Sequence, residues 1–164
     1  MRGTPVRRIL LPASSLQALV ENGLGAMKKS HHEYIHVDLR PAFADSLDID
    51  KAFEEGHEQE NRWDYLLGYG PTASVIAVEP HSAKQKEISA VIKKQVCAKE
   101  QLAPQLTPNA RIAAWFWVAS GKVHIANTER AIRRLEQHGI KFVHKMLMRK
   151  DLPIPQADGR SRGQ

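Results

Sequence analysis

The segment from Trp63 to His81, WDYLLGYGPTASVIAVEPH, constrains the fold of the chain more than any other stretch. Two apolar runs flank a turn at Gly70 and Pro71, a pattern that predicts a β-hairpin whose strands lie in a protein core. Each predicted strand also carries one acid, Asp64 in the first and Glu79 in the second. Because buried carboxylates are costly without compensating partners, these two acids are candidate functional residues.

The register of the hairpin decides whether the two acids meet. If Gly68 pairs with Val75, Asp64 lies opposite Glu79, with the two Cβ atoms about 5 Å apart. A slip of two residues leaves the acids as diagonal neighbours on one face, and a slip of one residue separates them. In the facing register the two carboxylates repel each other, which favours a divalent cation between them. Oxygen ligands of this kind suit Mg²⁺ or Mn²⁺ as the cofactor.

Hydrophobic periodicity predicts further helices and strands on both sides of the hairpin. The expected helices cover 14–22, 50–62, 83–102 and a segment capped by Asn127 or Thr128 and closed by Gly139. The expected strands cover 31–39, 111–119, 122–125 and 141–147, with a turn at Ser120-Gly121. The run 111–119 is almost continuously apolar, which indicates a mid-sheet strand buried on both faces. The predicted fold class is α/β (or α+β), with a central mixed sheet flanked by helices.

The order of these elements resembles the core of the PD-(D/E)xK nuclease superfamily over roughly residues 50–147. The resemblance implies a restriction-endonuclease-like fold in which Asp64 and Glu79 bind a metal ion that activates water against a phosphodiester. It also implies a lysine two residues after the second acid, where this chain has His81. The intervening residue, Pro80, cannot donate to a strand ladder and suggests that the strand ends at Glu79. The motif of the superfamily is therefore incomplete in this sequence.

Two residue types are candidates to replace the missing lysine. The resemblance extends to members whose lysine has moved to the next helix, so Lys93 or Lys94 is a substitute if its side chain points back at the sheet. The phase of the apolar residues on the 83–102 helix argues against Lys94 and places Gln95 nearer to the sheet. We therefore expect Asp64, Glu79, His81 and Gln95 to be the catalytic set.

The sequence also allows a metal site with a different set of ligands. Neutral imidazole coordinates metals readily, so His81 would complete an Asp, Glu, His set whose preference shifts toward Mn²⁺ or Zn²⁺. Glu58 or Glu60, on the expected helix before the hairpin, is a candidate for a further oxygen ligand. The alternative reading of the same acids is that they face solvent at the strand ends.

Charge is distributed unevenly along the chain, which has a net charge of +6. Acids predominate between Asp45 and Asp64, and basic residues predominate from Lys84 to Lys150. Because a basic surface attracts polyanions, nucleic acid is an expected partner, although a generally basic solvated surface gives the same count. The candidate phosphate contacts are Lys93, Lys94, Arg130, Arg133 and Arg134.

The 164 residues are expected to form one globular domain over 1–152 and a mobile tail over 153–164. A lone cysteine, Cys97, suits a reducing compartment and a cytoplasmic location, and no apolar run is long enough to suggest a membrane partner. The sequence leaves open the oligomeric state and the choice between DNA and RNA. It also leaves two alternatives to a nuclease: a non-catalytic nucleic-acid or protein interaction module of the same fold, and an oligomeric scaffold.

Overall fold

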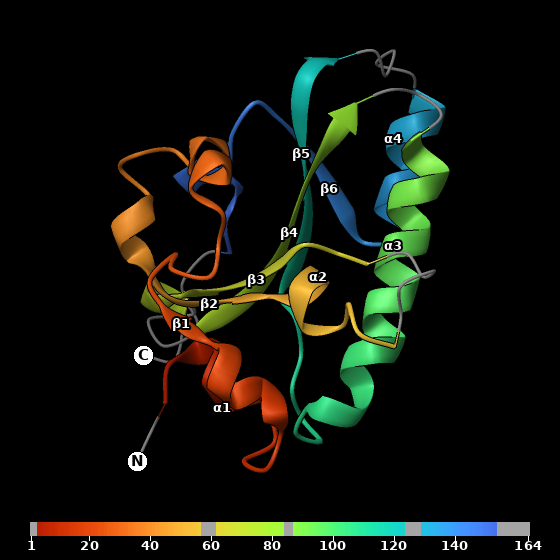
Figure 1. Ribbon diagram of the computed structural model, residues 1–164. Coiled ribbons are helices and arrows are strands. Elements are labelled where there is room, and N and C mark those ends of the chain that lie inside the picture. The colour runs from red at the N-terminus through yellow and green to blue at the C-terminus, as the bar shows by residue number, and fades with distance from the viewer. Residues whose placement is uncertain (1–2, 57–61, 84–86, 124–128, 154–164) are drawn as a thin grey trace, which may run out of the picture.

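The computed structural model describes residues 3–56, 62–83, 87–123 and 129–153. Their backbone forms a six-stranded sheet with the strands in sequence order from β1 to β6 (Figure 1). Neighbouring strands from β1 to β4 are antiparallel, whereas β5 and β6 join the sheet in parallel. The strands are β1 Glu21–Asn22, β2 Phe43–Asp48, β3 Tyr65–Tyr69, β4 Ser74–Ala83, β5 Ala114–Val123 and β6 Ile140–His144. This mixed sheet confirms the predicted α/β class.

Four α-helices and several 3₁₀ turns accompany the sheet in the described ranges. The helices are α1 Pro5–Ile9, α2 Ile49–Ala52, α3 Glu87–Leu102 and α4 Glu129–Gln137. The 3₁₀ turns are η1 Ser15–Leu19, η2 Lys29–Tyr34, η3 Arg40–Ala42, η4 Gly70–Thr72, η5 Ala103–Gln105 and η6 Arg149–Asp151. Figure 1 shows α3 and α4 together on one side of the sheet and the orange segments that include η2 and η3 on the other. Among the described residues, no helix has the length and apolar character needed to cross a membrane.

Both faces of the sheet bury apolar side chains. Trp115 and Trp117 of β5 belong to the cluster under α3 and α4, whereas Phe116 and Val118 belong to the cluster on the opposite face. All four residues are buried, because neighbouring side chains of a strand point to opposite faces and both faces of β5 are covered. The prediction of a strand buried on both faces is thus confirmed for residues 114–119, whereas residues 111–113 precede β5.

The hairpin has the register in which the two acids face each other. Gly68 pairs with Val75 and Tyr65 pairs with Val78, so Asp64 and Glu79 occupy the next opposed positions. β4 does not end at Glu79, contrary to the prediction, but continues to Ala83 beside β5. Pro80 is tolerated there because the pairing of β4 with β3 stops at Val78, leaving β5 as the partner of this part of the strand.

The predicted strand 31–39 is wrong. This segment contains η2, and only part of its alternating pattern matches burial: Ile35 is fully buried, but Val37 is 60% exposed. The strand that pairs with β3 is instead β2, which the sequence did not predict because Asp45, Ser46 and Asp48 interrupt its apolar pattern. Asp45 and Ser46 are buried all the same, since backbone N–H groups donate to their side chains.

Other predicted boundaries change in the structure. The expected helix 14–22 is η1 followed by β1. Of the expected helix 50–62, the first residues belong to the short α2, residues 53–56 are not helical, and residues 57–61 lie outside the described residues. The expected turn at Ser120-Gly121 is absent, because β5 runs without a break to Val123. Helices α3 and α4 and strand β6 agree with the prediction to within a few residues. The expected cap residues Asn127 and Thr128, and residues 154–164 of the expected tail, lie outside the described residues.

Asp45 fixes α1 against the sheet. Its Oδ2 atom accepts hydrogen bonds from the backbone N–H groups of Val6, at 3.0 Å, and Arg7, at 3.2 Å. A carboxylate at the first turn of a helix satisfies N–H groups that have no partner inside the helix. Gly68 of β3 leaves the space for this carboxylate, because a Cβ atom at Gly68 would stand 2.0 Å from Asp45 Oδ1 and 3.0 Å from the Cβ of Pro5.

We therefore predict that Gly68→Ala lowers the free energy of unfolding by about 3 kcal/mol, the upper end of the usual cost of overpacking a core. Urea denaturation followed by circular dichroism measures this change. Asp45→Ala should also destabilise the protein, because it leaves the α1 N–H groups buried without an acceptor. The double variant should cost clearly less than the sum of the two single variants, because removing Asp45 also removes the clash. Additive losses would contradict this account of Gly68.

Candidate functional site

Glu79 is a fully buried carboxylate on β4, on the face of the sheet that α3 covers. Both of its oxygens accept hydrogen bonds. Oε1 accepts from the backbone N–H of Asp64 at 2.9 Å, and Oε2 accepts from the ammonium of Lys94 at 2.5 Å. The side chain of Lys94 is 19% exposed, so this ion pair lies at the border between the core and the surface. Asp64, Glu79 and Lys94 are the centre of the candidate site.

The prediction that helical phase turns Lys94 away from the sheet is wrong. Lys94 lies three residues after Val91 and four residues before Ala98, and both of these α3 residues are fully buried between the helix and the sheet. Residues at these spacings share one face of a helix, so Lys94 sits on the buried stripe and extends its ammonium to Glu79. Its neighbour Lys93 is exposed.

Gln95, which was expected to reach the acids, has a different contact. It is 1% exposed, and its Nε2 donates to the backbone carbonyl of His138 at 2.7 Å. This bond ties α3 to the end of α4. The buried position of Gln95 was thus predicted correctly, but its hydrogen bond goes to the neighbouring helix rather than to Glu79.

His81 lies beside Glu79 on β4. Its Nδ1 atom is 3.6 Å from Glu79 Oε2, and its Nε2 atom is 3.0 Å from Oε1 of Glu87 at the start of α3. The indole N–H of Trp117 donates to the His81 carbonyl at 3.2 Å, which fixes the backbone there. The imidazole is therefore held between two carboxylates, with a quarter of its side chain exposed. Sequence reasoning missed Glu87, which is six residues from His81 and carries no recognisable motif.

The pKa values of all three groups in this cluster are shifted from their ordinary values. Burial, with the charge of Asp64 adding to it, raises the pKa of Glu79, and Lys94 opposes the rise. Burial also raises the pKa of Asp64 to about 6, with Lys94 opposing and Asp50 adding. Burial alone would lower the pKa of Lys94, but Glu79 and Asp64 outweigh it, and the pKa of Lys94 is raised. With all three groups ionised, two carboxylates share one ammonium, and the cluster has an excess negative charge.

The first turn of α2 completes the surroundings of Asp64. The backbone N–H groups of Ile49 and Asp50 donate to the Asp64 carbonyl at 2.8 and 3.4 Å. Asp50 itself pairs with Arg62 at 2.9 Å. The expected ligands Glu58 and Glu60 lie outside the described residues. Asp64 is thus held between β4 and α2.

The carboxyl groups of Asp64 and Glu79 are oxygen ligands of the kind that Mg²⁺ takes. Mg²⁺ commonly binds to one or two carboxylates, and substrate phosphate and water complete its coordination. Asp64 and Glu79 offer two carboxyl groups that interact electrostatically, which matches this number of protein ligands. Within the described ranges no group of three or more His, Cys, Asp or Glu side chains is placed to hold a metal ion.

The candidate phosphate contacts on α4 lie on the same side of the sheet as α3, the helix that carries Lys94 (Figure 1). Arg130, Arg133 and Arg134 are exposed on α4, where they line a hollow of about 420 Å³ together with Gln137. The opposite face of α4 packs into the core under the sheet. Figure 1 shows α4 beside α3, so these arginines lie on the helix that neighbours the helix of Lys94.

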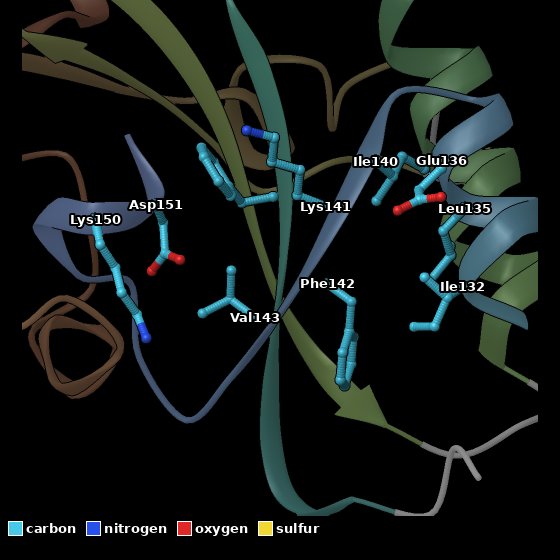
Figure 2. A pocket seen from close by; sticks show the side chains of 10 residues that line it. Ile132, Leu135, Glu136, Ile140, Lys141, Phe142, Val143, Lys150 and Asp151 are labelled. Atoms are coloured by element: carbon cyan, nitrogen blue, oxygen red, sulfur yellow. The ribbon is translucent and has the colours of Figure 1, made fainter. Parts of the chain in front are cut away.

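A second hollow, of about 350 Å³, lies at the β6 edge of the sheet. Figure 2 shows that side chains from α4, β6 and η6 surround it, among them Glu136, Lys141, Lys150 and Asp151. Because β6 is two strands away from β4, this hollow does not include the acid pair. We therefore place the candidate site at Asp64, Glu79 and Lys94.

Comparisons with protein-family models, with curated proteins and with solved structures find no match for this chain. Its function is accordingly inferred from the geometry of the acid cluster.

We predict that Asp64→Asn stabilises the metal-free protein at pH 7.5 by about 1–2 kcal/mol. Because the pKa of Asp64 is raised in the folded state to about 6, the folded protein binds more protons than the unfolded chain between pH 4 and 6. Stability therefore falls as pH rises through this window, and the asparagine removes that loss. The stabilisation stays in this range because Asp64 is partly exposed and solvent screens its charge.

Thermal unfolding from pH 4 to 8 in the presence of a chelator measures this effect. The matched control is Asp38→Asn, at a residue whose side chain is 85% exposed. Parallel pH profiles for the wild type and Asp64→Asn would contradict the electrostatic description of the site.

Proposed function

We propose that the protein is a metal-dependent nuclease-like enzyme that hydrolyses nucleic acid phosphodiesters at Asp64, Glu79 and Lys94. The observation that carries the proposal is the contact between Lys94 and Glu79 beside Asp64. The lysine that the PD-(D/E)xK pattern requires is absent from the strand, and a helix lysine brings an ammonium to the second acid instead. Two acids and a lysine are thereby brought together.

The strand topology supports the same proposal. Antiparallel β2, β3 and β4 are followed by α3 and then by β5, which is parallel to β4. This is the order of elements that the resemblance to the superfamily implies. A restriction-endonuclease-like core is part of the proposal for this reason.

The chain's own residues have separate roles in the proposed reaction. A divalent cation held by Asp64 and Glu79 would supply Lewis-acid polarisation of the phosphate and would acidify water. The Lys94 ammonium favours the ionised form of Glu79, against the effect of burial, and also stabilises negative charge that develops on the phosphoryl oxygens. His81, between Glu79 and Glu87, is the partly exposed group of the cluster that can transfer a proton.

A second candidate function is a non-catalytic nucleic-acid binding module of the same fold. Its specific support is that both oxygens of Glu79 already accept hydrogen bonds, one from the Asp64 N–H and one from Lys94. Lys94 thereby neutralises part of the negative charge of the cluster without a metal ion. In this reading the arginines of α4 bind phosphate, and the acid cluster only positions the hairpin and α3.

We predict that Lys94→Met lowers Mg²⁺- or Mn²⁺-dependent cleavage of oligonucleotides at least 100-fold, because one preorganised charge at a reacting group has about this effect. Asp64→Asn and Glu79→Gln should abolish cleavage. Lys93→Met is the matched control, since the same charge is removed from the neighbouring exposed position; as a candidate phosphate contact, Lys93 should affect substrate binding but not the cleavage rate at saturating substrate. Gel assays of radiolabelled DNA and RNA, with circular dichroism to verify folding, measure these effects.

Equal activity of the Lys94→Met and Lys93→Met variants would contradict the role of Lys94. Binding of nucleic acid by the wild type without cleavage in any divalent metal would select the binding module.

We also predict that replacing Arg130, Arg133 and Arg134 together with glutamine reduces the salt dependence of nucleic acid binding. Each phosphate contact contributes about 0.7–0.9 to the slope of log K against log salt concentration, so the slope should fall by about 2–3. Fluorescence anisotropy at several salt concentrations measures it. The charge-matched control replaces Lys145, Arg149 and Lys150, which are also exposed. A slope that falls equally in both variants would mean that α4 is not the phosphate-binding face.

A further inference from the structure

A pocket of about 540 Å³ lies between the 18–28 segment and α2, and the proposed reaction does not use it. Its apolar lining includes Ala18, Leu19 and Met27. Leu19 is 47% exposed, which is unusual for a large apolar side chain beside a hollow. The charged lining consists of the two lysines Lys28 and Lys51 and the three acids Glu21, Asp48 and Glu55. The pocket thus combines an apolar wall with ammonium and carboxylate groups.

This pocket lies at the same end of the β2–β3 pair as Asp64. Asp48 in its wall pairs with Tyr65, so its side chain lies on the sheet face opposite to the face that α3 covers. The residue after Asp48 donates its backbone N–H to the carbonyl of Asp64 at 2.8 Å, which joins the two sides at the end of the strands. The charges of Asp48 and Lys28 both act on the Asp64 carboxyl. A chain molecule that is bound at Asp64 therefore has the pocket as its neighbouring site across the first turn of α2.

Lys28 is held at the rim by its backbone. The N–H of Lys28 donates to the hydroxyl of Tyr65 at 3.1 Å, and this hydroxyl also contacts Nδ1 of His31 at 2.7 Å. The ammonium groups of the exposed residues Lys28 and Lys51 are suited to a phosphate. Asp48, like other carboxylates, can accept hydrogen bonds from the amino group of a nucleobase, and the apolar wall suits the face of its ring.

We propose that this pocket binds one nucleobase of the substrate strand, next to the phosphate bound at Asp64 and Glu79. Lys28 and Lys51 contact the adjoining phosphate. The proposal rests on the proposed function and specifies its substrate: a base in this pocket cannot remain stacked in a duplex, so the substrate is single-stranded or locally unpaired nucleic acid.

Methyl NMR spectroscopy of the intact protein tests the pocket without requiring cleavage. The probes are the four 5′-ribonucleoside monophosphates, the four 5′-deoxyribonucleoside monophosphates and inorganic phosphate. At least one nucleotide should shift the methyl signals of Ala18, Leu19 and Met27, whereas inorganic phosphate should not. A preference within the ribose or deoxyribose series identifies RNA or DNA as the source of the base. The proposal is overturned if no nucleotide shifts these methyl signals, or if inorganic phosphate shifts them equally.

Three variants make the test specific. Ala18→Trp fills the exposed rim and should abolish the nucleotide-induced shifts. Lys28→Ala should raise the dissociation constant of the nucleotide about tenfold, which is the effect of losing one hydrogen bond to a charged group. Lys29→Ala is the control, because Lys29 is exposed but does not line the pocket. Unchanged binding by Ala18→Trp, or equal weakening by the two lysine variants, overturns the assignment.

Cleavage assays separate this proposal from the proposed function. The wild type should cut single-stranded oligonucleotides at least tenfold faster than duplexes, and Ala18→Trp should lose this preference. Nucleotide shifts without any cleavage support the pocket and reject the nuclease. Cleavage without nucleotide shifts supports the nuclease and rejects the pocket.

Discussion

The carboxylate of Glu79 is buried in the central part of the sheet, and an ionised group in that position is stable only with close partners. Its partners are a backbone N–H of the neighbouring strand and the ammonium of a helix lysine. The first requires the observed register of β3 and β4, and the second requires the observed phase of α3. Because a slip of one residue would turn Asp64 to the other face, this single side chain couples hairpin register, helix packing and the candidate site.

The charges of Asp64, Glu79 and Lys94 are not balanced in a way that stabilises the folded protein. Two carboxylates share one ammonium, and burial raises the pKa of both acids. Perturbed titratable groups of this kind concentrate at functional sites, where stability is exchanged for reactivity. Under the proposed function, a polyanionic substrate would meet the outward arginines of α4 and the two lysines of the pocket beside α2, which three acids also line. Phosphate contacts away from the acids would hold a strand whose approach to the acids alone is unfavourable.

Local patterns in the sequence predicted the centre of the fold. The turn before Val75 predicted the hairpin and left the facing of Asp64 and Glu79 as one of three registers, of which the structure has the facing one. The continuous apolar run identified β5. Interactions between distant segments were not predictable: β2 carries Asp45, whose partner N–H groups lie nearly forty residues earlier in α1. Lys94 was misassigned because a long side chain on the border of an apolar stripe can reach a buried acid, which residue type alone does not reveal. Gln95 is buried through a contact with the carbonyl that follows α4, a tertiary feature.

The central claim is that Asp64 and Glu79 act together on one divalent cation. Calorimetric titration of Mn²⁺ into the wild type and into Asp64→Ala tests it most directly, because the measurement does not depend on knowing the substrate. We expect saturable heat with a stoichiometry of one for the wild type and no saturable heat for the variant. Equal heats for the two proteins, or no binding by the wild type with or without a single-stranded oligonucleotide present, would contradict the account.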